Sequence, residues 1–295
     1  MASQFNKSCF NYVGNKFRQL PQLIKIFPSN INNFIDLFTG GCDVAQNMIG
    51  RANHVYANDI NSLVIDIMRE FQTKPIDEIL DFVDKRIKQF DLSRTNKEGY
   101  VKYRELYNNG TYSSPLDLFT LARFSFNNNM RFNNNGEMNS AFGMNRSDFN
   151  SVQRKNTILL HNNLQSITLS SLNFADFNLD AFGEGDFIYA DPPYLISEAY
   201  YNCGAKETNQ RWEQPDDLRL FDYLDAAGKK HIKFAMSNFI NHKGKTNAKL
   251  IEWIEDNNYK TYDINSDYTN CVHCAIRTNL PTLEVVATNY DKGAE

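Results

Sequence analysis

A buried strand that stops at two consecutive prolines constrains the fold of this chain most. The apolar run Phe187–Ala190 predicts the strand, and Pro192 and Pro193 cannot donate hydrogen bonds to a sheet. Asp191 and Tyr194 are therefore held at the carboxyl end of a strand, where ligands bind in an open α/β sheet. A carboxylate and a flat ring suit a planar group with an amino function. The alternative is a rigid turn without chemistry.

The chain has 295 residues, 42% of them hydrophobic and 13% aromatic, which is enough for one large core or one domain with a substantial insertion. Its formal net charge is −4, so any surface that binds nucleic acid must be local. The sequence has neither a leader pattern nor an apolar run long enough to span a bilayer. We expect a soluble, intracellular protein without membrane contact.

The five cysteines are odd in number and scattered, which argues against a disulfide framework. Cys271 and Cys274 have the spacing of metal ligands, but no second pair of cysteine or histidine residues is available to complete four ligands. We therefore expect reduced thiols and no bound metal.

A glycine turn in the first part of the chain predicts a ligand loop. An apolar strand at residues 33–38 runs into Gly40 and Gly41, and Cys42–Ile49 is predicted to be a helix. The full dinucleotide fingerprint and a Walker loop are both absent. About 20 residues further on, a second predicted strand ends at Asp59, where this kind of fold places an acidic residue on ribose hydroxyls. The alternative for Asp59 is a capping role at the following helix.

An insertion follows this first half. Residues 62–109 have a mostly helical pattern with charged, solvated faces, and residues 116–126 predict another helix. The asparagine-rich segment 123–155 carries five basic residues against two acidic ones. Asparagine and arginine pair with base edges in the major groove, and residues 132–138 have the composition of a hairpin tip. The alternative is a polar surface loop.

Strand patterns resume after residue 156. We expect strands at residues 167–172, 232–238 and 282–289, and helices at residues 215–227 and 248–257. The last strand is expected at an edge of the sheet, and Gly228 is expected to close the first helix. Asp176, between two phenylalanines, either holds an adenine amino group of a cofactor or simply adjoins packed rings. Residues 195–214 lack periodicity and suggest a flap over the site.

Several motifs, in this order, resemble those of the Dam-type, alpha-group DNA adenine-N6 methyltransferases, particularly the phage-like members. The segment Tyr12–Lys16 looks like the N-terminal cofactor motif, and Phe34–Gly41 looks like the glycine loop. Ala57–Asp59 matches the ribose-binding strand end, and Ser170–Asp176 and Gly185–Tyr194 match later strands. The resemblance is spread over most of the chain.

The resemblance implies an α/β, Rossmann-like, S-adenosylmethionine-dependent methyltransferase sheet with an inserted helical and β-hairpin DNA-recognition domain. Residues 1–61 and 157–295 would form the catalytic domain, and residues 62–156 the recognition domain. Methyl transfer from S-adenosylmethionine would go to a flipped adenine in double-stranded DNA, with no metal and no covalent nucleophile. Tyr194 would stack on the base, while Asp191 and the Pro192 carbonyl would accept hydrogen bonds from N6. By position, the residues in contact with the cofactor would be Tyr12, Lys16, Asp36, Phe38, Gly40, Asp59, Ile60, Asp176 and Asp191.

The residues that we expect to contact DNA are Arg123, Asn127, Arg131, Asn133 and Arg146. GATC is a candidate recognition sequence. Ala141 and Met144 depart from GATC-reading members, which commonly have proline and a basic residue there. A monomer or weak dimer, with a cognate restriction endonuclease as a candidate partner, would fit such an enzyme. The resemblance also implies a place in the cytoplasm of a prokaryotic or phage-infected cell.

Three alternatives stay open. The same catalytic motif serves cytosine-N4 and RNA-adenine methylation, and a relative without activity would bind DNA but transfer no methyl group. Asp191 in first position favours a nucleobase over a protein glutamine, and the basic, asparagine-rich insertion favours DNA over RNA.

Overall fold

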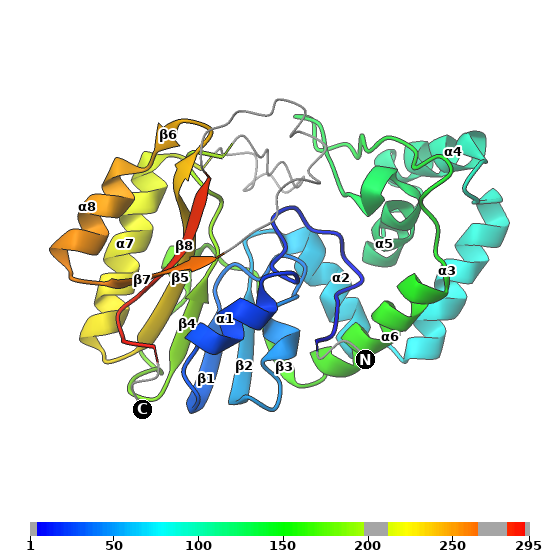
Figure 1. The fold of residues 1–295 in the computed structure, drawn as a ribbon. Coiled ribbons are helices and arrows are strands. Elements are labelled where there is room, and N and C mark those ends of the chain that lie inside the picture. The colour runs from blue at the N-terminus through cyan, green and yellow to red at the C-terminus, as the bar shows by residue number, and fades with distance from the viewer. Residues whose placement is uncertain (1–4, 198–211, 265–281, 293–295) are drawn as a thin grey trace.

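The computed structural model describes residues 5–197, 212–264 and 282–292, which form an α/β fold around one mostly parallel sheet (Figure 1). The eight-stranded sheet has the order β3-β2-β1-β4-β5-β8-β7, and β6 pairs with β5. The strands are β1 (Ile31–Asp36), β2 (Ala52–Asn58), β3 (Ile167–Ser170), β4 (Phe187–Ala190), β5 (Lys233–His242), β6 (Lys245–Thr246), β7 (Lys260–Ile264) and β8 (Leu283–Thr288).

Helices cover the sheet and form the insertion. They are α1 (Leu20–Ile26), α2 (Ser62–Thr73), α3 (Ile76–Phe90), α4 (Lys97–Asn108), α5 (Pro115–Phe124), α6 (Ser151–Leu164), α7 (Gln214–Lys229) and α8 (Ala248–Asp256). Three 3-10 turns are η1 (Ala45–Asn47), η2 (Phe126–Asn128) and η3 (Phe174–Asp176). None of the helices in the described ranges is long and apolar enough to cross a membrane.

Parallel pairing brings the ends of distant strands together. Strand β1 pairs in parallel with both β2 and β4, and β2–β3 and β4–β5 are also parallel. The carboxyl ends of these strands therefore share one edge of the sheet. Because the chain leaves β1 toward β2 and later returns beside it as β4, the crevice between β1 and β4 is the switch point where ligands bind in such folds.

The central strands are buried on both faces, which explains their continuous apolar sequences. Phe34, Phe187 and Tyr189 face a core that includes residues of α1, α2 and α6. Ile35 and Ile188 face the opposite way, into a core with residues of α7 and α8. The predicted α/β methyltransferase-type sheet is confirmed.

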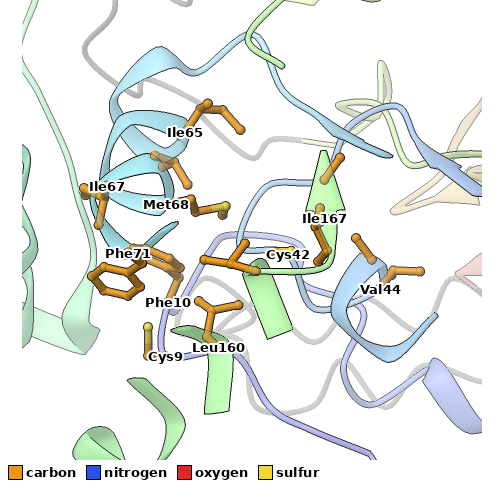
Figure 2. Close-up of a cluster of buried hydrophobic side chains, with 14 of the residues drawn as sticks. Cys9, Phe10, Cys42, Val44, Ile65, Ile67, Met68, Phe71, Leu160 and Ile167 are labelled. Atoms are coloured by element: carbon orange, nitrogen blue, oxygen red, sulfur yellow. The ribbon is translucent and has the colours of Figure 1, made fainter. Parts of the chain in front are cut away.

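One hydrophobic cluster fixes the N-terminal segment to the glycine turn and the insertion. Figure 2 shows Cys9 and Phe10 of that segment near Phe71 of α2 and Leu160 of α6, with Cys42 and other residues completing the cluster. The Phe10 ring stacks on Phe71 with their centroids 6.3 Å apart. The segment that leads into the expected cofactor motif is thus anchored by the core.

The insertion lies beside the sheet, on the side away from α7 and α8 (Figure 1). The predicted helices of residues 62–126 are present as α2 to α5. The predicted hairpin tip is also present, with an antiparallel bridge between Phe132 and Met138, but the pairing is an isolated bridge and not a ladder. The predicted domain boundary after residue 156 falls inside α6.

The predicted edge position of the last strand is wrong. Strand β8 lies between β5 and β7, and β7, which the sequence pattern did not reveal, occupies the edge. The strand β7 reads Lys-Thr-Tyr-Asp-Ile, and its exposed polar positions hide the strand pattern.

Two predicted helix boundaries are also wrong. Cys42–Ile49 is not an α-helix but a series of turns around η1, because Cys42 has a left-handed backbone with φ 66° and only a few residues precede β2. Helix α7 continues through Gly228 to Lys229, and His231, with φ 61°, takes the left-handed position beyond its end.

Candidate active site

Three aspartates meet at the carboxyl edge of the sheet, of which Asp36 and Asp59 are buried and Asp191 is half-buried. Asp36 ends β1, Asp59 follows β2 and Asp191 follows β4. Burial, together with the neighbouring charges of Asp191 and Asp59, raises the pKa of Asp36 to about 8. The structure brings these three carboxyl groups together because parallel strands bring their ends to one edge.

Asp59 shapes the glycine turn. One carboxylate oxygen accepts the backbone N–H of Gly40 at 2.8 Å, and the other accepts that of Asn61, also at 2.8 Å. Asn61 is the N-cap residue of α2 and its side chain makes no capping hydrogen bond, so Asp59 contacts the start of this helix without capping it. Burial raises the pKa of the Asp59 carboxyl, and its two hydrogen bonds act against that rise.

Tyr12 lies against the glycine turn. A Cβ atom on Gly40 would lie 2.7 Å from Cδ1 of the Tyr12 ring, and Gly40 has φ 49°. Both its conformation and the close ring require glycine. The Asn61 amide donates to the Tyr12 hydroxyl at 3.2 Å, so Tyr12 bridges the turn and the start of α2.

The Asp36 carboxylate also holds the glycine turn. Its Oδ2 atom accepts hydrogen bonds from the Thr39 hydroxyl and from the Ala45 N–H, each at 3.1 Å. Its side chain is buried, so the structure gives it a role in holding the loop that surrounds the expected cofactor.

An aromatic wall stands beside the strand ends. The Phe38 ring lies 5.6 Å from Phe174 and 5.8 Å from Trp212, between ring centroids. Asp176 is exposed at the end of η3, two residues beyond Phe174, and Ile60 is half-buried after β2. Phe38, Ile60 and Asp176 therefore follow β1, β2 and β3, whose carboxyl ends lie at this edge of the sheet.

Four side chains form a buried polar cluster at the end of β4. The Lys16 ammonium lies 2.7 Å from Asp191 Oδ2 and 3.7 Å from Glu284 Oε1. The Tyr194 hydroxyl lies 2.9 Å from Asp191 Oδ1 and 2.8 Å from Glu284 Oε1. The Tyr194 ring also packs edge-on against Phe239, with the centroids 4.7 Å apart.

The cluster contains two carboxylates and one ammonium. Burial tends to lower the pKa of Lys16, but the carboxylates of Asp191 and Glu284 outweigh it, and the pKa is raised. Burial raises the pKa of Asp191, and Glu284 adds to that rise against the attraction of Lys16. Lys16 therefore stays protonated between Asp191 and Glu284.

Sequence reasoning missed Glu284. It comes from β8 and its side chain is fully buried. The signal was present, because Glu284 is the single charged residue in the apolar strand Leu-Glu-Val-Val-Ala-Thr, and a charged side chain in a buried strand requires a partner.

The residues expected at DNA have different environments. Arg131 and Arg146 are exposed, and the Arg146 guanidinium lies 4.9 Å from the centre of the Phe126 ring. Asn127 is half-buried with a left-handed backbone, and its carbonyl accepts the Asn11 side chain at 2.6 Å. These three residues belong to one loop region after α5.

Asn133 builds the tip of the loop. Its amide donates to the Glu137 carboxylate at 2.7 Å, and its oxygen accepts the N–H groups of Asn135 and Glu137. The side chain expected to contact DNA is thus already used on both ends within the loop.

The prediction that Arg123 contacts DNA is wrong in this structure. Its side chain is fully buried, bonds to the Cys9 carbonyl and lies 2.9 Å from the Gln153 side chain. The guanidinium also stacks over Phe119 at 4.7 Å. Arg123 lies in the last turn of the buried helix α5, and composition alone does not show that its side chain points inward.

Two other expectations fall outside the described residues. The suggested flap at residues 195–214 lies largely in residues 198–211, and Cys271 and Cys274 lie in residues 265–281.

Comparisons with known proteins agree with this geometry. Residues 12–270 match the family model described as D12 class N6 adenine-specific DNA methyltransferase. The chain is 36% identical over 290 residues to the modification methylase StsI of Streptococcus sanguinis and to the type II methyltransferase M.FokI of Planomicrobium okeanokoites. It is 26% identical over 243 residues to the DNA N-6-adenine-methyltransferase of Escherichia phage P1.

These matches cover most of this chain but only part of its relatives. They span 98% of the chain and 43% of each of the first two relatives, and 80% of the chain and 30% of the phage protein. The predicted resemblance to adenine-N6 methyltransferases is confirmed by the family match, which covers most of the sequence. The chain belongs to the D12 class N6 adenine-specific DNA methyltransferase family.

Proposed function

We propose that this chain transfers a methyl group from S-adenosylmethionine to N6 of an adenine in double-stranded DNA. The observation that carries this proposal is the Asp191-Pro-Pro-Tyr194 turn at the end of β4, paired with Lys16 beside the switch point of the sheet, in a member of this family. The strand ends, the glycine turn and this turn would together form the ligand site, at the edge of the sheet where such folds bind ligands.

The described residues fit S-adenosylmethionine, which carries a sulfonium and an ammonium cation. Carboxylates at the strand ends, the buried Asp59 and the half-buried Asp191 among them, favour a cationic ligand. The Asn61 side-chain oxygen is buried and has no hydrogen-bond partner among the described residues, so it can accept a donor of a ligand. When bound, this cofactor supplies an electrophilic methyl group. Tyr12 and Gly40 would hold its nucleoside end, and Phe38 and Ile60 would form its apolar wall.

The target adenine must leave the duplex, because its amino group is out of reach inside the helix. The Tyr194 ring would stack on the extruded base, while Asp191 and the Pro192 carbonyl would accept the hydrogens of its amino group. These bonds would orient the nitrogen lone pair toward the methyl group, so the catalytic contribution is one of positioning. The amino nitrogen loses one hydrogen as a proton when its new bond to carbon is complete.

The loop after α5 would grip the DNA. Arg131 and Arg146 are exposed cations there, next to Asn127, in a protein whose net charge is −4. We assign helices α3 to α5 and this loop to DNA recognition, with the catalytic role in the sheet. GATC remains the candidate recognition sequence.

The test is methylation of unmethylated genomic DNA by the purified protein and S-adenosylmethionine, with modified bases located by single-molecule sequencing. We expect methyladenine at one short sequence, and none from a folded Asp191→Ala variant. Methylcytosine, or methylation of RNA alone, would contradict the proposal and favour the alternatives with the same fold. DNA binding without any methyl transfer would indicate a relative that has lost its activity.

The names of two relatives, a modification methylase and a type II methyltransferase, suggest a biological role. We propose that this chain, as a monomer or weak dimer, protects DNA from a cognate restriction endonuclease. DNA methylated by this protein should resist one endonuclease that cuts the same sequence in unmodified DNA, and cleavage at that sequence would contradict this role.

A further inference from the structure

Glu284 has no task in the proposed chemistry, although it lies beside the groups that would carry it out. Its side chain has 0% exposure, on a strand that reaches the site from the far end of the sequence. Its Oε1 atom lies 2.8 Å from the Tyr194 hydroxyl and 3.7 Å from the Lys16 ammonium. Removing a carboxylate fully from water costs free energy, so a buried carboxylate needs partners for its charge.

Asp191 already has a partner on each of its oxygens. Oδ2 faces the Lys16 ammonium at 2.7 Å, and Oδ1 faces the Tyr194 hydroxyl at 2.9 Å. An oxygen whose charge is neutralised by an ammonium is a poor acceptor for the uncharged amino group of adenine. Each of these oxygens can accept a second hydrogen bond, but Asp191 becomes a stronger acceptor for the base when one of these contacts loosens.

Glu284 lies close enough to pair with the Lys16 ammonium and the Tyr194 hydroxyl when Asp191 releases them. The hydroxyl of Tyr194 has one hydrogen, so it can donate to only one of the two carboxylates at a time. Lys16 is nearly buried and would be left without a counter-charge if Asp191 turned away and no other carboxylate were near.

We propose that Glu284 is a positioning residue that takes over the Lys16 ammonium and the Tyr194 hydroxyl when Asp191 engages the adenine amino group. The exchange moves no covalent bond. It keeps the Tyr194 ring held at its hydroxyl end from β8 while its face is used for stacking. This inference rests on the proposed DNA-adenine activity.

The experiment compares Glu284→Gln with the unchanged protein. The substitution keeps the size of the side chain and removes its charge, so Lys16 should stay paired with Asp191. We expect the single-turnover methylation rate to fall about 100-fold. The dissociation constants for S-adenosylmethionine and for the DNA should change less than about threefold, because Glu284 is expected to act after both have bound.

A second readout separates positioning from general damage. 2-Aminopurine carries its amino group at C2, so its extrusion from the duplex does not depend on a bond from N6 to Asp191. Fluorescence of this base at the target position should therefore rise equally with both proteins. Glu284→Asp, which keeps the charge, should recover part of the lost rate. Glu252→Gln removes an exposed carboxylate on α8 that pairs with Lys249, and serves as the control.

An unchanged rate in Glu284→Gln would overturn the inference. A parallel loss of rate, binding and base extrusion would also overturn it, because Glu284 would then be a purely structural residue. A Glu284→Asp variant that is slower than Glu284→Gln would overturn it as well. Absence of methylation by the unchanged protein would instead overturn the proposed function, and with it this inference.

Discussion

At the scale of single residues, the Tyr12 ring lies close against the backbone of Gly40 in the glycine turn. The backbone of Gly40 has φ 49°, and any Cβ atom there would meet the Tyr12 ring at 2.7 Å. The turn thus depends on glycine for two separate reasons, one conformational and one steric.

Gly40→Ala should weaken S-adenosylmethionine binding about tenfold and lower the free energy of unfolding by about 1–2 kcal/mol. Titration calorimetry and chemical denaturation measure the two effects. Gly110→Ala is the matched control, because Gly110 has φ 83° and nothing within 4 Å of its missing Cβ. It should lose stability only. Equal cofactor affinity in both variants would show that the contact with Tyr12 is unimportant.

Asp36 predicts a pH dependence of stability. Burial raises its pKa from 3.8 to about 8, so the folded state binds this proton more tightly than the unfolded state. Between these two values the unfolded chain has lost the proton and the folded chain keeps it. The contribution of Asp36 to stability should therefore fall as the pH rises from about 4 to 8, the opposite of a salt-bridged aspartate.

Asp36→Asn tests this dependence. Its side-chain oxygen can still accept the hydrogen bonds of Thr39 and Ala45 that Asp36 accepts now. The free energy of unfolding, measured by denaturation at several pH values, should decline less between pH 5 and pH 8 in the variant. Parallel curves for the two proteins would show that Asp36 is ionised throughout.

At the scale of elements, the sequence predicted best where periodicity and burial agree. Strand β4 was located within its observed bounds because a wholly apolar run ends at two prolines. Strand β7 escaped because its polar residues are exposed at the edge, and β8 was placed wrongly because strand order depends on contacts between distant segments. Of the polar cluster, Lys16, Asp191 and Tyr194 were predicted from local motifs. Glu284 was not, since only the sheet order brings it there.

Helix α5 buries an arginine, whereas the loop after it exposes one. Arg123 is buried, burial lowers its pKa, and its Nε and Nη2 atoms have no hydrogen-bond partner within the described residues. Arg131, in the loop, is exposed.

Arg123→Ala should lower the free energy of unfolding by about 3 kcal/mol through lost packing and hydrogen bonds, with little change in the salt dependence of DNA binding. Arg131→Ala should do the reverse, leaving stability unchanged and reducing the slope of log affinity against log salt by about 1. Denaturation and binding at several salt concentrations measure both. A reduced slope in Arg123→Ala would restore the original expectation that this residue contacts DNA.

At the scale of the whole molecule, the short N-terminal segment of residues 9–12 contacts both the insertion and the glycine turn. The Cys9 carbonyl bonds to Arg123 of α5, and the Asn11 side chain bonds to the Asn127 carbonyl at 2.6 Å. Immediately afterwards, Tyr12 packs on Gly40. This segment is a physical connection between the loop expected at DNA and the turn expected at the cofactor.

Asn11→Ala should therefore reduce the effect of DNA on cofactor affinity. We expect S-adenosylmethionine to bind the free variant normally, while the increase in affinity on adding duplex DNA falls about threefold, as expected for one exposed hydrogen bond. Calorimetry with and without DNA measures this coupling. Asn53→Ala, which removes an exposed contact with Asn32, is the control, and an equal loss of coupling there would refute the connection.

The polar cluster joins Lys16, near the start of the chain, to Glu284, near its end. A polypeptide that emerges from the ribosome therefore cannot complete this cluster until β8 has been synthesised. Products terminated before Glu284 would keep Lys16, Asp191 and Tyr194 but lack the strand between β5 and β7 as well as this carboxylate. We expect such products to be degraded.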